Sequence, residues 1–165
     1  MKISIQSLKQ GLTRFSEKIP PDFIEKSYSN FYPEDFFVNV EVDKFERDIR
    51  LKLVVKSTAN YKCDSCLKDF ESNIEIQQQQ MYEIGPAPEE NSDHEIIYLT
   101  RDTIELDLTN LLNEGVVLNH PIKMQCSDNC KGLCPGCGVD LNLEQCICEE
   151  GDIDPRWEKL RKLIK

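Results

Sequence analysis

Eight cysteines are the side chains of this sequence with the clearest capacity for chemistry. They come in four pairs of near neighbours: Cys63 and Cys66, Cys126 and Cys130, Cys134 and Cys137, and Cys146 and Cys148. Zinc takes four ligands at the corners of a tetrahedron, with Zn–S distances of about 2.3 Å, so neighbouring ligand sulfurs lie about 3.8 Å apart. Short spacers on tight turns deliver that separation. The spacing therefore predicts metal ligation and not a disulfide framework.

By count, eight thiolates make two four-cysteine sites, so we expect two structural Zn²⁺ ions. One arrangement has a first site of Cys63, Cys66, Cys126 and Cys130 and a local second site of Cys134, Cys137, Cys146 and Cys148. Other pairings stay open, as does a single metal with four unbound thiols. Each structural zinc contributes on the order of 10 kcal/mol to folding, so we expect chelation to unfold the protein in part.

The segment Cys134-Pro135-Gly136-Cys137-Gly138 is the strongest single signal for a zinc knuckle. Proline fixes φ, and the two glycines let the backbone fold so that N–H groups point at thiolates. The two histidines, His94 and His120, are expected to face solvent or to be satisfied locally, because cysteine alone fills both sites.

No constellation of catalytic residues is present in the sequence. It contains no glycine-rich phosphate loop and no histidine placed beside a nucleophile, and four cysteines leave no open position for water on a zinc ion. We therefore expect a non-enzymatic protein with no small-molecule substrate. Two alternatives stay open: a thiol-based redox protein that uses Cys63 and Cys66, and a small zinc-ribbon regulatory or interaction protein.

The charge of the chain is unevenly distributed. Its 20 basic and 30 acidic side chains give a net charge of −10, but residues 1–18 carry +3 and residues 156–165 carry +4. The acidic body should repel nucleic acid, because phosphate neutralisation by Lys and Arg carries most nucleic-acid affinity. The candidate contacts to a partner or to RNA are therefore basic side chains in the second half of the chain: Lys131, Arg156, Lys159, Arg161 and Lys162.

The sequence offers no segment suited to a membrane. Its longest apolar run is the four residues 96–99, and the first residues lack the hydrophobic stretch of a secretory signal. We expect a cytoplasmic protein, where a reducing environment keeps cysteines available for metal.

Alternating apolar residues predict β-strands in the first half. Residues 38–42 and 49–55 alternate with the period of a sheet that has one wet face, and a further strand is expected near 70–76. Cys63 and Cys66 would then lie at a hairpin tip. A strand at 95–99 follows the acidic, proline-containing segment 85–95, which we expect to be a mobile surface loop.

Two helices complete the predicted elements. The first runs from about 107 to 118, with Asp107 as a possible N-cap, and must end before Pro121. The second, at 154–165, is basic and amphipathic, with Asp154 as N-cap and Pro155 at the first helical position.

Together these elements predict an α+β fold. Its antiparallel β-sheet core would carry a central helix, a C-terminal helix and a cysteine-rich, zinc-ribbon-like annex. We expect a β-rich core at 1–125, a zinc-binding annex at 126–153 and a basic helix at 154–165, integrated into one domain.

Several motifs resemble one known family. They are Cys63-Asp-Ser-Cys66-Leu67 followed by Phe70, the stretch from Cys126 to Asn142 that contains Cys130-Lys-Gly-Leu-Cys134-Pro-Gly-Cys137-Gly, then Cys146-Ile-Cys148 and Asp154-Pro-Arg156. In order and spacing they are similar to the bacterial YceD-like family, named for large ribosomal RNA subunit accumulation. The resemblance covers roughly residues 30–165.

The resemblance implies a function in ribosome biogenesis. A member of this family would be a non-enzymatic, cytoplasmic protein that supports accumulation or processing of large-subunit (23S) ribosomal RNA. The expected partner is a ribosomal protein, an assembly factor or the ribosomal RNA itself. Because the body is acidic, we favour docking on a basic protein, with the basic ends touching RNA at most.

Overall fold

The computed structural model describes residues 1–86 and 96–148. It divides into two compact units, of which the first comprises Met1–Tyr61 and Asp69–Ile122. Within the described residues, the second comprises Lys62–Lys68 and residues 123–148. The predicted division at residues 125 and 153 stays a prediction, and the predicted C-terminal helix lies outside the described residues.

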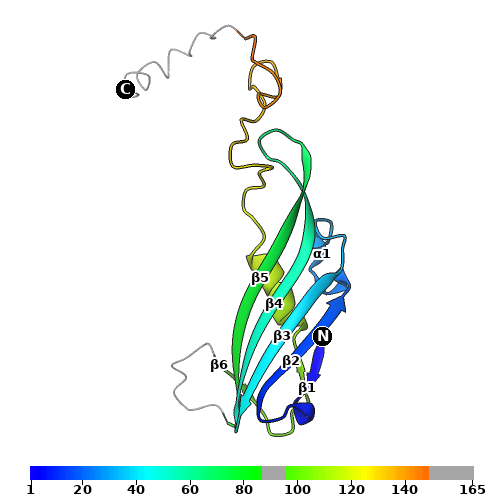
Figure 1. Cartoon of the computed structure of the whole chain (residues 1–165), viewed down its shortest axis with the longest axis vertical. Helices are drawn as coiled ribbons and strands as arrows, with labels where there is room; N and C mark the ends of the chain where they lie inside the picture. The colour runs from blue at the N-terminus through cyan, green and yellow to red at the C-terminus, as the bar shows by residue number, and fades with distance from the viewer. Residues whose placement is uncertain (87–95, 149–165) are drawn as a thin grey trace, which may run out of the picture. The chain divides into compact units, whose positions relative to one another are not determined.

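The first unit is built on a five-stranded sheet (Figure 1). Its order is β2 (Gly11–Ile19), β3 (Phe36–Phe45), β4 (Asp48–Lys62), β5 (Asp69–Ile84) and β6 (Ile96–Leu99). The pairs β2–β3 and β3–β4 are antiparallel, whereas β5 and β6 run parallel. The predicted α+β class is thus confirmed, with one parallel pair added to the expected antiparallel sheet.

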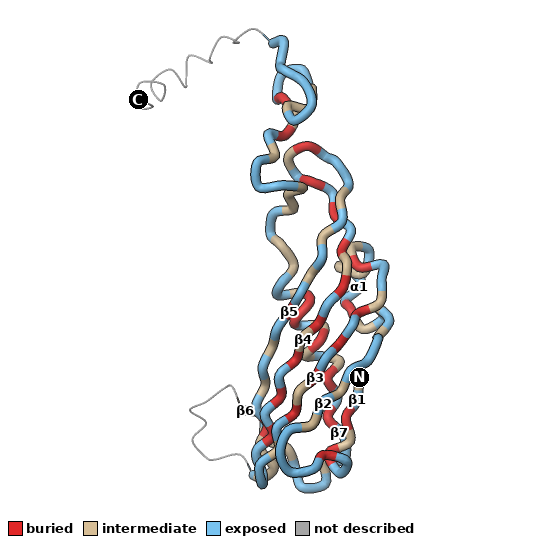
Figure 2. The backbone as a smooth tube through the Cα atoms, viewed as in Figure 1, coloured by how far each residue is buried: buried red, intermediate tan, exposed pale blue. Residues whose placement is uncertain are grey.

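Alternation of side chains explains the central hairpin. On β3, Val38, Val40 and Val42 are buried while their neighbours Asn39 and Asp43 face solvent. β4 repeats the pattern from Ile49 to Val55, and the alternation of buried and exposed backbone is visible in Figure 2. Removing these aliphatic groups from water is the main stabilising contribution to this unit.

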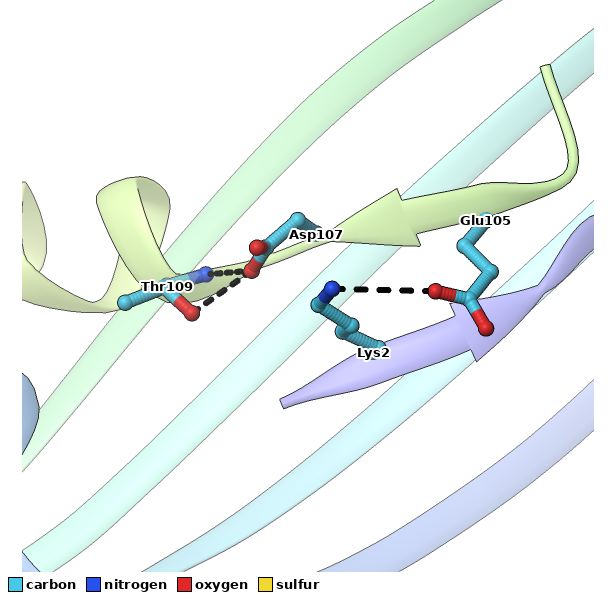
Figure 3. A network of polar contacts seen from close by, with 4 residues as sticks. All are labelled: Lys2, Glu105, Asp107 and Thr109. Atoms are coloured by element: carbon cyan, nitrogen blue, oxygen red, sulfur yellow. Dashed lines mark hydrogen bonds and ion pairs between the residues drawn. The ribbon is translucent and has the colours of Figure 1, made fainter.

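A two-stranded ribbon leads into the main helix. β1 (Lys2–Ser4) pairs antiparallel with β7 (Glu105–Asp107), and Lys2 and Glu105 form an exposed ion pair of 3.8 Å (Figure 3). The Asp107 carboxylate then accepts hydrogen bonds from the backbone nitrogen (2.9 Å) and hydroxyl (2.6 Å) of Thr109 (Figure 3). These bonds, that of the hydroxyl first, lower the pKa of Asp107.

Helix α2 (Thr109–Leu118) is the predicted central helix. It begins two residues later than expected, because Asp107 belongs to β7 and Leu108 takes the cap position. It buries Leu112 and Val116 and packs against β5 and the short helix η2 (Pro21–Phe23). The helix ends before Pro121, as predicted. The other short helical segments are η1 (Ile5–Ser7) and α1 (Lys26–Ser29).

None of the helices within the described residues combines the length and apolar character needed to cross a bilayer.

An aromatic cluster surrounds His120, just after α2. Its ring lies against Tyr28 and Phe31, with ring centroids 4.9 and 4.8 Å away, and its Nδ1 hydrogen bonds with the Tyr32 hydroxyl at 3.0 Å. The same hydroxyl hydrogen bonds with that of Tyr61 at 3.1 Å. Burial raises the pKa of Tyr32 and lowers that of His120, so both are neutral near neutral pH.

Replacing Tyr32 by Phe should destabilise the first unit by about 1–3 kcal/mol, because it removes both hydrogen bonds and leaves the buried Tyr61 hydroxyl without its partner. Urea unfolding monitored by near-ultraviolet circular dichroism measures the change. Tyr28→Phe is the matched control, since the Tyr28 hydroxyl makes no hydrogen bond within the described residues, and it should change stability by less than about 0.5 kcal/mol. Equal effects of the two variants would show that the hydroxyl cluster contributes nothing specific.

Candidate metal centre

The eight cysteine sulfurs gather in two groups of four, both in the second unit. One group is Cys63, Cys66, Cys126 and Cys130, and the other is Cys134, Cys137, Cys146 and Cys148. Within each group all four sulfurs lie within 4.8 Å of one another. Of the pairings left open by the sequence, the structure brings together the one with a long-range first group and a local second group. All eight are free thiols.

The first group is assembled from the β4–β5 hairpin and a segment sixty residues later. The Sγ atoms of Cys63 and Cys130 are 3.8 Å apart, and those of Cys66 and Cys126 are 3.6 Å apart. Cys63 and Cys66 are buried. The expectation that this pair lies at a hairpin tip is met, since β4 ends at Lys62 and β5 begins at Asp69.

A pair of reciprocal hydrogen bonds positions the later segment. The Asp64 backbone nitrogen donates to the Met124 carbonyl at 2.8 Å, and the Met124 nitrogen donates to the Asp64 carboxylate at 2.7 Å. This fixes the chain two residues before Cys126. Asp64 is not among the site residues predicted from the sequence, although its place between two cysteines is a local signal.

The second group is local, and its sulfurs are equally close. The Cys146 Sγ lies 3.2 Å from that of Cys134 and 3.8 Å from that of Cys137, and the Cys134 and Cys148 sulfurs are 4.0 Å apart. Three of these four cysteines are exposed; only Cys134 is buried. A side chain at Gly136 would be tightly confined, since a Cβ there would lie 3.0 Å from the Cys148 sulfur and that sulfur would have to shift by a few tenths of an ångström.

Both Cys-x-x-Cys segments adopt the same turn. In the first, the Leu67 nitrogen donates to the Cys63 carbonyl (2.9 Å) and the Cys63 nitrogen donates to the Lys68 carbonyl (2.8 Å). In the second, Gly138 donates to Cys134 (2.9 Å) and Cys134 to Val139 (2.8 Å), at the same offsets. The knuckle predicted from proline and glycine at 134–138 therefore also forms at 63–68, where neither residue is present.

The electrostatics of each group favour thiolates only in part. Backbone N–H groups, that of Cys126 first, lower the pKa of Cys63 to about 6. The Cys137 backbone N–H, followed by the Cys146 side chain and the Gly136 N–H, lowers the pKa of Cys134 to about 6. Neighbouring sulfurs, Cys137 first, raise the pKa of Cys148 to about 12. Without a cation, four crowded thiols cannot all ionise.

A bound cation would resolve that conflict. The observed sulfur separations range from 3.2 to 4.0 Å, around the value of about 3.8 Å that a tetrahedral four-thiolate zinc site requires. A tetrahedral set of four sulfurs suits zinc or iron and does not suit magnesium or calcium, which prefer oxygen. The residues present therefore fit a metal ion at each group.

The other predicted site residues are placed as follows. Lys131 is exposed in the second unit, between the two cysteine groups in sequence. The predicted contacts Arg156, Lys159, Arg161 and Lys162 lie outside the described residues, as does His94. His120 lies in the aromatic cluster of the first unit, and neither group of metal-capable residues includes a histidine.

Asn142 is a site residue that the sequence analysis did not assign. Its Nδ2 donates to the Cys130 sulfur at 3.5 Å and to the Asp140 carboxylate at 2.7 Å. Its Oδ1 accepts a hydrogen bond from the Lys131 nitrogen at 2.8 Å. The available signal was its position in the ribbon between Cys137 and Cys146, but only the fold brings it to Cys130.

Comparison with known proteins gives a family and distant relatives. The family model described as large ribosomal RNA subunit accumulation protein YceD matches residues 51–164. One protein of Mycobacterium bovis and two of Mycobacterium tuberculosis, each described as uncharacterized, are 26% identical over 129 residues. The alignment covers 77% of this chain and 61% of each relative. No solved structure matches significantly.

Leu67 stands in a backbone conformation that favours glycine. Its φ is +60°, against +75° for Gly138 at the equivalent position of the second knuckle, and its side chain is 55% exposed. A residue with a Cβ in this region of backbone space costs about 1–2 kcal/mol. Replacing it by glycine removes that strain, but part of the gain is lost because glycine has a higher conformational entropy in the unfolded chain. Leu67→Gly should therefore stabilise the second unit by about 0.5–1 kcal/mol, measured from the midpoint of its unfolding in urea.

Gly138→Ala is the matched reverse change. A Cβ at Gly138 meets nothing within 4 Å, so only the φ of +75° opposes it, and we expect a loss of about 1 kcal/mol. If Leu67→Gly instead lowered the midpoint, the leucine side chain would contribute contacts that outweigh the backbone strain.

Proposed function

We propose a function from one premise: the chain belongs to the family of the large ribosomal RNA subunit accumulation protein YceD, whose model matches residues 51–164. That match is the observation that carries the proposal. The protein is a non-enzymatic factor of bacterial ribosome biogenesis, and it supports accumulation or processing of large-subunit ribosomal RNA in the cytoplasm. The chain spans 61% of the length of the relatives it matches.

In this proposal the metal is zinc, and its role is structural. Cys63, Cys66, Cys126 and Cys130 hold one ion, and Cys134, Cys137, Cys146 and Cys148 hold the other. Zinc bound by four thiolates supplies cross-linking of the chain and has no open position for water or substrate. The support is the all-sulfur donor set and the short distances within each group.

The proposed partner is a basic ribosomal protein or assembly factor. The chain has a net charge of −10, so docking on a cationic protein surface is favoured and tight capture of bare RNA is opposed. Lys131 and the basic residues Arg156, Lys159, Arg161 and Lys162 are the proposed contacts wherever the chain approaches ribosomal RNA.

The redox alternative rests on the Cys63 and Cys66 pair, and the lowered pKa of Cys63 is the structural observation in its favour. However, Cys63 is completely buried, whereas reactive redox cysteines are accessible. Its sulfur also lies 3.8 Å from that of Cys130 on a distant segment, and the Cys66 sulfur lies 3.6 Å from that of Cys126. These cross-segment contacts support shared metal ligation over a Cys63–Cys66 dithiol.

Two zinc ions per chain are expected in protein purified under reducing conditions. Cys66→Ser and Cys148→Ser should each reduce the zinc content by one, because each removes a ligand of a different group. Elemental analysis and native mass spectrometry give the count and the identity of the metal. Iron in place of zinc would overturn the metal assignment, and metal-free protein with eight titratable thiols would favour the redox alternative.

Depletion of the protein should lower large-subunit ribosomal RNA relative to small-subunit RNA by about twofold or more, and the intact chain should restore the ratio. Gel or sequencing quantification of total RNA measures this. Unchanged ribosomal RNA would contradict the proposed function.

The partner class is tested by purification of the tagged protein from the same cells, with and without ribonuclease. Ribosomal or assembly proteins that stay bound after RNA digestion would support protein docking. Their loss on digestion would show that RNA is the direct partner.

A further inference from the structure

We propose that Asn142 is a positioning residue that couples the two four-cysteine sites, so that metal in the second site strengthens metal binding in the first. This inference rests on the proposed metal binding and goes beyond it, because independent sites would serve a purely structural role equally well. Four observations within the second unit carry it.

The first observation is the short link between the sites. Cys130 belongs to the first group and Cys134 to the second, so only residues 131–133 separate ligands of the two ions. A displacement of this segment that improves the ligand geometry of one site therefore also changes the position of a ligand in the other site.

The second observation is that this linking segment packs closely on the first knuckle. The Leu133 nitrogen donates to the Ser65 carbonyl at 2.9 Å. Gly132 has a φ of +73°, and a Cβ there would lie 2.9 Å from the Ser65 carbonyl oxygen. Only glycine allows this approach, so the backbone of the link lies directly against the Cys63–Cys66 turn.

The third observation is that the same segment pairs with the ribbon of the second site. Leu133 and Asp140 form an antiparallel bridge, and the Leu141 nitrogen donates to the Gly132 carbonyl at 3.0 Å. Residues 132 and 133 are therefore held from both sides, by the first knuckle and by the loop that the second ion would close.

The fourth observation is the direct contact made by Asn142. This residue lies between Cys137 and Cys146 of the second group, yet its Nδ2 donates to the sulfur of Cys130 in the first group at 3.5 Å. The Asp140 carboxylate accepts hydrogen bonds from both the Asn142 Nδ2 (2.7 Å) and its backbone nitrogen (2.9 Å). Asp140 therefore requires the NH₂ end of the amide to face the sulfur, since a carboxylate can only accept.

The hydrogen bond from Asn142 should strengthen metal binding by Cys130, because a ligand sulfur carries negative charge. An N–H donor stabilises a thiolate and orients it toward the metal, and loss of such outer contacts typically weakens metal affinity about 10–100-fold. The loop that carries Asn142 is fixed by Cys137 and Cys146, so metal in the second site orders the donor that serves the first. By thermodynamic linkage the effect is reciprocal.

The test uses the full chain and stepwise titration with Zn²⁺ against a competing chelator, with cadmium NMR to assign each step to a site. Cys148→Ser disables the second site, and we expect it to weaken the first about tenfold. Asn142→Ala should also weaken the first site about tenfold. In the Cys148→Ser background it should add little, because the loop that positions the Asn142 amide is no longer held by metal there. Such non-additivity is the signature of coupling through Asn142.

Two further variants make the test specific. Asn129→Ala is the matched control: this exposed amide lies beside Cys130 in sequence, makes no hydrogen bond within the described residues, and should leave both affinities unchanged. Asn142→Asp keeps an acceptor for the Lys131 nitrogen but faces the sulfur with a second negative charge, so it should weaken the first site more than alanine does.

Equal affinity of the first site in the wild type and in Cys148→Ser would overturn the coupling while leaving the proposed metal binding intact. A loss confined to the second site in Asn142→Ala would also overturn it, because Asn142 would then serve only its own loop. Absence of metal binding in the wild type would instead overturn the proposed function and the inference together.

Discussion

Mutual repulsion among crowded sulfurs is the constraint on which the second unit depends. Four thiols whose sulfurs lie within 4.8 Å of one another cannot all ionise in the absence of a cation, and the pKa values of Cys134 and Cys148 in the second group, about 6 and about 12, display the conflict. A divalent ion removes it. The described part of this unit contains no named helix or strand beyond the last residue of β4, so bound metal would add cross-links where the chain otherwise has only isolated backbone hydrogen bonds.

The two knuckles show how little local sequence is needed once the ligands are fixed. Pro135, Gly136 and Gly138 prepare the second turn, whereas the first turn forms with Asp64, Ser65 and a leucine at positive φ. The first turn compensates through contacts from elsewhere: Met124 binds Asp64, and Leu133 binds Ser65. The turn of the second group therefore forms through the local conformational preferences of proline and glycine. The turn of the first group forms through tertiary contacts.

The same distinction decides what could be predicted from sequence. The β3–β4 hairpin follows from strict alternation of Val38 to Val42 and Ile49 to Val55, and α2 from its apolar stripe and Pro121. β7 could not be found, because its three residues form a strand only through pairing with β1. The parallel direction of β6 and the contact of Asn142 with Cys130 likewise depend on long-range placement. The periodicity of apolar residues shows which side chains are buried, but it does not show which strand or side chain each one contacts.

Binding of two zinc ions would make the chain more acidic. Two zinc ions bring +4 while eight thiolates bring −8, so the net charge of −10 would become −14 on full loading. A zinc ion enclosed by four thiolates is therefore an anionic group, and it repels phosphate. Attraction to ribosomal RNA would have to come from a few basic side chains or through a cationic protein. Under the proposed function, an acidic chain that bound two zinc ions would therefore be better matched to a basic protein surface of the ribosome than to bare nucleic acid.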